Sequence, residues 1–323
     1  MRLSVVVSTL NDRERLISCL DSLERQLPTP VELVVVNGPS SDGTTGAVRE
    51  RDAVDVLVEI SERNANVSRN AGFEATTGDT VAFLRGDQLI GSSWYSAIET
   101  ATQNGVEVVT GPITERTAAG PQTKQARSIG GRSVTAFNGT NVAFDRELLE
   151  SLDGFDEYLC DRGDSDCAHR LGAFEATVDW SDEMAVRRTV GTDGGHAKPD
   201  WGQRYRSLAY LLAKNYGVHP RVVGHPIASA VGDGFNATRA VLSGEGTPSS
   251  WLANGKAVAT NTVLGLRDGL RARYEDRSPR RNPNGVSTRH DRAVARYDRR
   301  EGAETDSASG SDSDSDSNSE SAS

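Results

Sequence analysis

The stretch LSVVVSTLNDRERLISCLDSL, residues 3–23, decides the fold class of this chain. It opens with a largely apolar run, Leu3–Ser8, and leads into a segment, Glu14–Leu27, whose leucines recur every three or four residues. A continuous apolar run is typical of a strand that is buried on both faces, and the spacing of the leucines is typical of a helix with one apolar face. The stretch therefore predicts a buried strand followed by a helix that covers it.

The same alternation continues through the first half of the chain. Strands are expected at residues 33–37, 54–60, 80–84 and 106–110, and helices at residues 44–51, 70–76 and 92–103. This order predicts an α/β fold with a mostly parallel central sheet and helices on both faces. In open sheets of this type ligands bind beyond the carboxyl ends of the strands, so the residues that follow each strand are the candidates for a site.

The second half is less regular. Residues 114–135 are rich in Gly, Ser, Thr and Arg and predict a loop or linker, whereas Trp201–Tyr216 has a helical pattern. We expect one α/β domain at residues 1–225 with halves at 1–111 and 112–225, and a helical extension at 226–300. The acidic low-complexity segment at 301–323 predicts a disordered tail.

Composition narrows the classes of partner and source. The net charge of −10 is spread along the chain, which disfavours binding to nucleic acid. Only four of the 36 Lys and Arg residues are lysine, which indicates either a halophilic archaeal source or GC-rich coding. Three cysteines without a C-x-x-C pair, no secretion signal and no run of ~18 apolar residues predict a cytoplasmic protein, soluble or peripheral at the inner face of the membrane.

Three common nucleotide-binding classes lack their motif here. The residues after the first strand, Ser8–Arg13, contain no glycine, whereas a dinucleotide-binding site needs G-x-G-x-x-G at that place. A Walker A loop is also missing, as is the Gly-rich N-terminal signature of the sugar nucleotidyltransferases.

Four segments instead resemble, in order and spacing, the inverting glycosyltransferases of family 2, which have the GT-A fold. They are VVVSTLNDRERLISCLDSL (5–23), VELVVVNGPSSDGTTGAV (31–48), ERNANVSRNAGFEATTGDTVAFLRGD (62–87) and NGTNVAFDRELLESLDGFDEYLCDRGDSDCAHRL (138–171). The resemblance implies transfer of a hexose or a derivative from a nucleoside-diphosphate sugar to a glycan or a lipid-linked glycan. It makes residues 1–111 the nucleotide-sugar-binding half and residues 112–225 the acceptor-side half.

In this family a D-x-D motif at a strand end usually holds a divalent metal ion. Here the motif is Arg85-Gly86-Asp87, so the resemblance implies Mn²⁺ or Mg²⁺ at Asp87, with His196 as a further ligand. Arg85 is expected to pair either with a phosphate or with Asp87. The structural alternatives are a turn aspartate for Asp87 and an ordinary loop residue for His196.

The resemblance also implies the residues that contact the nucleotide: Thr9, Asn11, Asn37, Asp42 and Arg69. Asn37 occupies the place of an aspartate that commonly contacts the base and ribose, and an amide can also hydrogen-bond a uracil edge. Asp42 is open to a second interpretation, as the residue that forms a turn before the helix at Thr44. For Arg69 the alternative is an ordinary surface arginine.

Inverting transfer needs a general base on the acceptor hydroxyl, and in this family an aspartate at the start of a helix supplies it. In Arg162-Gly163-Asp164-Ser165-Asp166 the residue that aligns with the base is Asp164, and its structural alternative is a helix N-cap.

An archaeal source would imply a polyprenyl-phosphate-linked acceptor used in surface-protein glycosylation. The Arg-rich residues 267–300 either contact an anionic membrane or form a solvated helix. The alternative from another class is a catalytically silent GT-A domain that binds a glycan or a partner, favoured by the altered acidic motifs.

Overall fold

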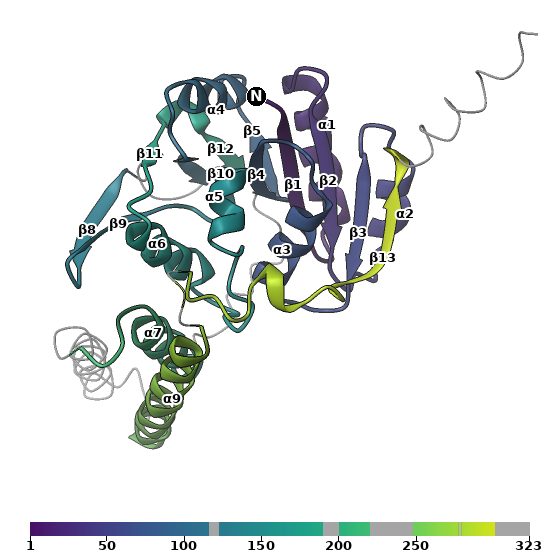
Figure 1. Cartoon of the computed structure of the whole chain (residues 1–323). Coiled ribbons are helices and arrows are strands. Elements are labelled where there is room, and N and C mark those ends of the chain that lie inside the picture. Colours follow the sequence, from purple (N-terminus) through teal and green to yellow (C-terminus); the bar gives the residue numbers. More distant parts are fainter. Residues whose placement is uncertain (116–122, 190–199, 220–247, 277, 279, 301–323) are drawn as a thin grey trace, which may run out of the picture.

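The computed structural model describes residues 1–115, 123–189, 200–219, 248–276, 278 and 280–300 (Figure 1). Its centre is a mixed eight-stranded sheet with the order β11-β6-β10-β4-β1-β2-β3-β13. The strands are β1 (Leu3–Thr9), β2 (Glu32–Asn37), β3 (Val56–Ile60), β4 (Thr80–Arg85), β6 (Val108–Thr110), β10 (Asn141–Asp145), β11 (Val178–Trp180) and β13 (Ala293–Asp298). Neighbours among β4, β1, β2 and β3 are parallel, whereas β10 and β13 run antiparallel to their partners. The predicted α/β class with a mostly parallel centre is confirmed.

Helices cover both faces of this sheet. On β1, Val6 points into the core with α3, α5 and α6, whereas Val5 and Val7 point into the core with α1, α2 and α4. The helices are α1 (Arg13–Gln26), α2 (Thr44–Arg49), α3 (Ala65–Ala75), α4 (Trp94–Gln103), α5 (Arg146–Ser151) and α6 (Gly163–Ala173). The apolar run of β1 is therefore buried on both sides, which is why it lacks the alternation of a half-exposed strand.

Helix α3 begins five residues before the predicted start at Asn70. The Asn64 side chain caps it by accepting a hydrogen bond from the Asn66 amide at 2.8 Å. Within the helix Gly72 permits close contact with the sheet, since a Cβ there would lie 2.3 Å from Cγ1 of Val6. The helix therefore lies unusually near β1.

The prediction of a loop at residues 114–135 is wrong for the second part of this range. Residues Gln125–Ile129 (β8) and Arg132–Ala136 (β9) form an antiparallel hairpin that turns at Gly130 and Gly131, both with positive φ. The side chains of β8 are mostly exposed, so the strand has no apolar alternation to reveal it. A separate three-stranded sheet consists of β5 (Gln88–Ile90), β12 (Val186–Arg188) and β7 (Ile113–Glu115).

The C-terminal part combines helices with a strand of the main sheet. Helix α7 (Trp201–Tyr216) has the predicted bounds and packs along α9 (Pro248–Glu275) (Figure 1). The chain then returns to the sheet, where β13 pairs with the edge strand β3. The helical extension expected at 226–300 is thus helical in α9, whereas β13 belongs to the main sheet. Two short 3₁₀ helices complete the described elements: η1 (Asp182–Met184) and η2 (Val286–Thr288).

Two further expectations concern the tail and the membrane. The tail expected at 301–323 lies outside the described residues. Among the helices that are described, none combines the length and the apolar character that crossing a bilayer requires.

Candidate functional site

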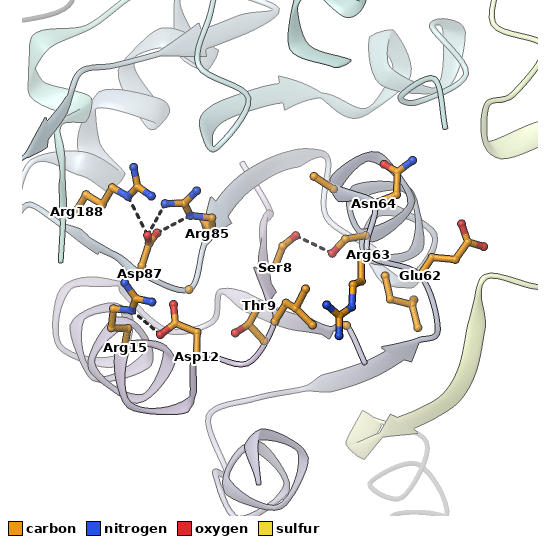
Figure 2. Close-up of a pocket in the computed structure, with 16 residues that line it drawn as sticks. Ser8, Thr9, Asp12, Arg15, Glu62, Arg63, Asn64, Arg85, Asp87 and Arg188 are labelled. Atoms are coloured by element: carbon orange, nitrogen blue, oxygen red, sulfur yellow. Dashed lines mark hydrogen bonds and ion pairs between the residues drawn. The ribbon is translucent and has the colours of Figure 1, made fainter. Parts of the chain in front are cut away.

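A cavity of about 340 Å³ lies at the carboxyl ends of the parallel strands (Figure 2). It is bordered by residues that follow β1, β3 and β4, by the start of α3 and by one residue of β12. Its lining consists of Ser8, Thr9, Leu10, Asp12, Arg15, Gly38, Ile60, Glu62, Arg63, Asn64, Ala65, Ser68, Arg85, Gly86, Asp87 and Arg188. The cavity is therefore where sheets of this type bind ligands.

Backbone hydrogen bonds fix the floor of this cavity. The Gly38 amide donates to the Thr9 carbonyl and the Gly86 amide to the Ser8 carbonyl, both at 2.9 Å. Gly86 has to be small, because a Cβ there would lie 3.3 Å from Cβ and Oγ1 of Thr9. The hydroxyl of Thr9 is buried and has no hydrogen-bond partner in the described structure. A buried hydroxyl in the wall of a cavity is costly unless a ligand or water satisfies it.

Asp87 is the centre of the charged wall, and two arginines bind its carboxylate (Figure 2). Nε of Arg85 donates to Oδ1 at 2.7 Å, and a second nitrogen of the same guanidinium donates to Oδ2. Nε of Arg188 donates to Oδ2 at 2.9 Å. Burial raises the pKa of Asp87, but the hydrogen bonds and charges of Arg85 and then Arg188 outweigh it and hold the pKa below its ordinary value.

This arrangement does not fit a divalent metal ion at Asp87. Both carboxylate oxygens already accept hydrogen bonds from guanidinium groups, whose positive charges oppose a cation. Across the described ranges, no three His, Cys, Asp or Glu side chains are grouped closely enough to hold a metal. The other expected ligand, His196, lies outside the described residues. Of the two roles considered for Arg85, the structure has the pairing with Asp87.

The balance of charge in the cavity wall favours an anion. Four arginines line it against three acids, and Asp12 is paired with Arg15 at 2.5 Å. The fourth arginine, Arg63, is exposed and forms no ion pair within the described part of the chain (Figure 2). Guanidinium groups bind phosphate oxygens through parallel N–H donors, so this wall suits a diphosphate.

Asn11, Asn37 and Asp42 lie in the loops after β1 and β2 but do not line the cavity, and they hold these loops together. Asn11 accepts from the Ser41 amide at 2.8 Å, and Asn37 accepts from the Ser40 hydroxyl at 2.7 Å. Asp42 accepts from the Thr44 hydroxyl at 2.6 Å and from the Arg13 amide at 2.9 Å. Asp42 therefore forms the turn before α2, and contact of these three residues with a nucleotide stays a prediction.

Arg69 is buried rather than an ordinary surface arginine. Its Nε donates to the Gly139 carbonyl at 2.9 Å, and its guanidinium lies 5.0 Å from the ring centre of Phe155. Burial lowers the pKa of Arg69, the charge of Asp164 raises it, and Arg85 adds a smaller lowering. Arg69 thus does not line the cavity; it follows the cavity residue Ser68 in α3 and lies beside Asp164, since a Cβ on Gly139 would be 3.0 Å from both.

Asp164 lies in the first turn of α6 with its side chain half-buried. Its carboxylate accepts from the amide of Ser165 at 2.8 Å, whereas the N-cap position belongs to Arg162, which caps with no side-chain hydrogen bond. A Cβ on Gly139 would lie 3.0 Å both from Asp164 Cβ and from Nη2 of Arg69, so a glycine is needed for this approach. The N-cap alternative therefore does not describe Asp164.

The neighbouring acid, Asp166, is committed to the protein interior. It is fully buried and accepts from Arg170 at 2.8 Å, from Lys214 at 2.9 Å and from Asn215 at 2.8 Å. Burial raises the pKa of Asp166, but the positive charges of Lys214 and Arg170 outweigh this effect and lower the pKa to about 2. The Asp166 carboxylate is therefore fully engaged by its three partners inside the protein, whereas the Asp164 side chain is half-buried.

The sequence did not single out Arg188 or Arg15. Arg188 lies 101 positions after Asp87 and reaches it through the pairing of β12 with β5. A two-arginine strand with the sequence VRR is the one available signal, and it does not reveal which residue the arginine pairs with. Arg15 is one of several charges on α1, and its loop partner Asp12 became evident only from the fold.

A comparison with known protein families identifies the family of the stretch that forms most of the cavity. A model described as "Glycosyl transferase family 2" matches residues 4–154, the stretch that carries β1 to β4 and the floor of the cavity. Through this stretch the chain belongs to glycosyltransferase family 2. The family is one of inverting, nucleotide-sugar-dependent transferases.

Two curated relatives agree with this assignment. The glycosyltransferase AglE of Haloferax volcanii is 26% identical over 178 residues, which are 50% of this chain and 58% of AglE. The uncharacterized glycosyltransferase EpsJ of Bacillus subtilis is 29% identical over 111 residues, 33% of this chain and 32% of EpsJ. The matches thus span less than two thirds of these relatives' own length.

Solved structures support the GT-A-like fold of this family 2 chain. The mannosyltransferase PcManGT from Pyrobaculum calidifontis, in complex with GDP-Man and Mn²⁺, superposes with a TM-score of 0.53 at 22% identity, covering 86% of this chain and 88% of PcManGT. TarS 1–349 of S. aureus, in complex with UDP-GlcNAc, gives a TM-score of 0.57 at 16% identity, covering 85% and 92%. At these identities the likeness concerns the fold.

Proposed function

We propose that this chain transfers one sugar from a nucleoside-diphosphate sugar to a hydroxyl of a glycan or lipid-linked glycan, with inversion. The observation that carries the proposal is the arginine-rich cavity at the strand ends, with Arg69 next to it in α3. Ser68 lines the cavity, and a Cβ on Gly139 would lie 3.0 Å from both Arg69 and Asp164, which brings the Asp164 side chain close to this end of α3. A donor bound in the cavity would place its diphosphate against the arginines and its sugar toward Asp164.

The chemistry is a single displacement at the anomeric carbon. The acceptor oxygen forms a bond to this carbon while the bond to the diphosphate oxygen breaks, and that electron pair leaves on the diphosphate. The Asp164 carboxylate takes the proton of the attacking hydroxyl. The cationic wall stabilises the negative charge that develops on the leaving group.

The acceptor and the cellular place follow from the relatives rather than from the cavity. AglE is a protein of a haloarchaeon, and the arginine-rich, lysine-poor composition of this chain agrees with a similar source. We propose a polyprenyl-phosphate-linked glycan as the acceptor, used in protein glycosylation. The enzyme would then act in the cytoplasm, peripherally at the inner face of the membrane.

Exchange of Asp164 for asparagine tests the role of the base. Asp164→Asn keeps the size and the hydrogen bond from Ser165 but removes the basic oxygen, so we expect transfer to fall by about 10²–10⁴-fold. Binding of the nucleoside diphosphate should change little. Transfer to a panel of glycan acceptors, with binding measured by calorimetry in molar KCl, gives both quantities.

Asp161 offers a matched control. It is an exposed aspartate three residues before Asp164, and it accepts a hydrogen bond from its own neighbour Arg162. Asp161→Asn should leave transfer within about twofold of the wild type, as expected of an exposed acid outside the reaction. Equal losses in both variants would contradict the role of Asp164. Nucleotide binding without transfer to any acceptor would favour the catalytically silent domain.

A further inference from the structure

We propose that Arg85 and Arg188 bind the diphosphate of the donor directly and replace the divalent metal ion at this site. The inference rests on the proposed function, because it names how the donor cavity holds its ligand. It also accounts for the sequence Arg85-Gly86-Asp87, in which an arginine stands where a metal site needs an acid.

The geometry gives the two arginines a common orientation. Arg85 at the end of β4 and Arg188 at the end of β12 approach one carboxylate from two separate sheets (Figure 2). The side chains of both are 40% exposed, whereas that of Asp87 is 3% exposed. The carboxylate therefore lies beneath the guanidinium groups, which present their outer surfaces toward the cavity that both line.

Asp87 acts in this arrangement as an anchor for the arginines. A single buried carboxylate carries one negative charge, and the two guanidinium groups carry two positive charges, so the cluster keeps a net charge of about +1. A divalent ion would add to a site that is already positive, whereas a diphosphate would complement it. The positive charge that metal ions usually supply to the leaving group is thus already part of the protein.

The hydroxyl of Thr9 is a second, independent sign of a ligand. It lines the same cavity, is buried, and has no hydrogen-bond partner among the described residues. Such a group gains a partner when a phosphate oxygen or a ribose hydroxyl binds beside it. Thr9 and the two arginines therefore line one cavity, and a ligand would reach the hydroxyl, which is buried in the wall, after a small movement of that wall.

The two mechanisms predict opposite effects of Asp87→Asn. If Asp87 were a metal ligand, its loss would abolish Mn²⁺-dependent nucleotide binding. If Asp87 anchors the arginines, the variant removes one of the three negative charges that line the cavity while an amide oxygen still accepts a hydrogen bond from a guanidinium, so nucleoside-diphosphate affinity should stay the same or rise. The sign of this change distinguishes the mechanisms without any measurement of transfer.

The experiment titrates UDP, GDP and dTDP into wild-type protein by calorimetry, once in EDTA and once in excess Mn²⁺. We expect one of them to bind with an affinity that the metal changes by less than about threefold. Arg188→Gln should weaken this binding about tenfold or more, the range for losing a charge-assisted hydrogen bond. The corresponding monophosphate should lose less, since it makes fewer contacts with the arginine pair.

Arg187 provides the matched control on the same strand. It is exposed, whereas Arg188 is half-buried against Asp87, and successive side chains of a strand point to opposite faces. Arg187→Gln removes the same charge and should leave diphosphate affinity within about twofold. A loss as large as in Arg188→Gln would mean that general attraction, not the pair at Asp87, binds the nucleotide, and it would overturn the inference.

The remaining outcomes separate this inference from the proposed function. Binding that appears only with Mn²⁺ and disappears in Asp87→Asn would overturn the arginine mechanism and leave the transferase proposal standing. Binding of no nucleoside diphosphate in either buffer, by protein shown to be folded, would overturn both. Thermal unfolding of each variant shows whether the fold is kept, and Arg85→Gln is a second variant if Arg188→Gln does not fold.

Discussion

The two halves of the molecule are held together by different forces. Around β1 to β4, aliphatic and aromatic side chains pack both faces of the sheet, with Val5, Val7 and Leu84 on one face and Val6 and Phe83 on the other. Around α6 and α7, the interior contains charges, and Lys214 is completely buried between Asp156 and Asp166. The part around β1 to β4, proposed as the donor half, therefore depends on packing, and the part around α6 and α7, proposed as the acceptor half, depends on the pairing of specific ions.

This difference indicates which parts of the protein tolerate amino-acid substitutions without a large loss of stability. Apolar cores accept substitutions that preserve volume and lose a few kcal/mol at most when a cavity is created. A buried ion network has no such tolerance, because loss of one member leaves its partners charged and unsolvated. Asp164, the proposed base, thus lies next to the part of the protein that we expect to be most sensitive to single substitutions.

The largest effect on stability is expected for Lys214→Met, which tests whether the buried ions are needed for stability. The variant leaves two buried aspartates without their shared cation, so we expect the free energy of unfolding to fall by about 3–5 kcal/mol. Urea unfolding followed by circular dichroism measures it, with Lys256→Met as a control because Lys256 is exposed on α9. An unchanged midpoint for Lys214→Met would mean that the network is not needed for stability.

Low pH should destabilise the part around α6 and α7 before it destabilises the part around β1 to β4. The folded pKa of Asp166 is about 2 and lies below the ordinary value, so the unfolded chain binds a proton more readily than the folded chain between about pH 4 and pH 2. Stability from this group is therefore present above pH 4 and is lost as the pH falls through this window, by on the order of 2 kcal/mol. Hydrogen exchange should show α6 and α7 losing protection at a higher pH than β1 and β4. Simultaneous loss in all four would contradict the contrast.

A smaller effect tests how tightly the donor half is packed. Gly72→Ala places a methyl group 2.3 Å from Cγ1 of Val6, so overpacking should destabilise the protein by about 1–3 kcal/mol. Gly46→Ala is the matched control, since a Cβ there meets nothing within 4 Å in helix α2, and the change should be neutral or stabilising. Thermal unfolding of both variants compares them, and equal melting temperatures would show that α3 can shift away from β1.

The fold of the part proposed as the donor half could be predicted from the sequence, because its strands and helices show local patterns of apolar residues. The strand predicted at Leu3–Ser8 follows from its apolar run, the helix predicted at Glu14–Leu27 follows from the spacing of its leucines, and the cavity follows from the rule that parallel strands bind ligands at their carboxyl ends. Arg85 and Asp87 were identified because Arg85-Gly86-Asp87 stands where the family that the sequence resembles has its D-x-D motif.

The parts that could not be predicted depend on contacts between distant segments. The pairing of Arg188 with Asp87 depends on two strands meeting in the small sheet, and the burial of Lys214 depends on the docking of α7 on α6. Strand β13 lies in the Arg-rich residues 267–300, which predicted a membrane contact or a solvated helix rather than a sheet partner. The β8–β9 hairpin had a usable signal in Gly130-Gly131, a dipeptide that favours two-residue hairpin turns.

The return of the chain to β3 affects how the protein is made. Strand β13 covers the outer edge of β3, and the amide of Arg299 donates to the Asp55 carbonyl at 2.9 Å beside it. During translation, β3 emerges early, whereas its edge partner emerges only after residues 61–292 have left the ribosome. Throughout this interval the nascent sheet presents an open row of backbone donors and acceptors, which is the kind of edge that attracts other strands. Assembly in the cell therefore depends on shielding one edge until the last strand arrives.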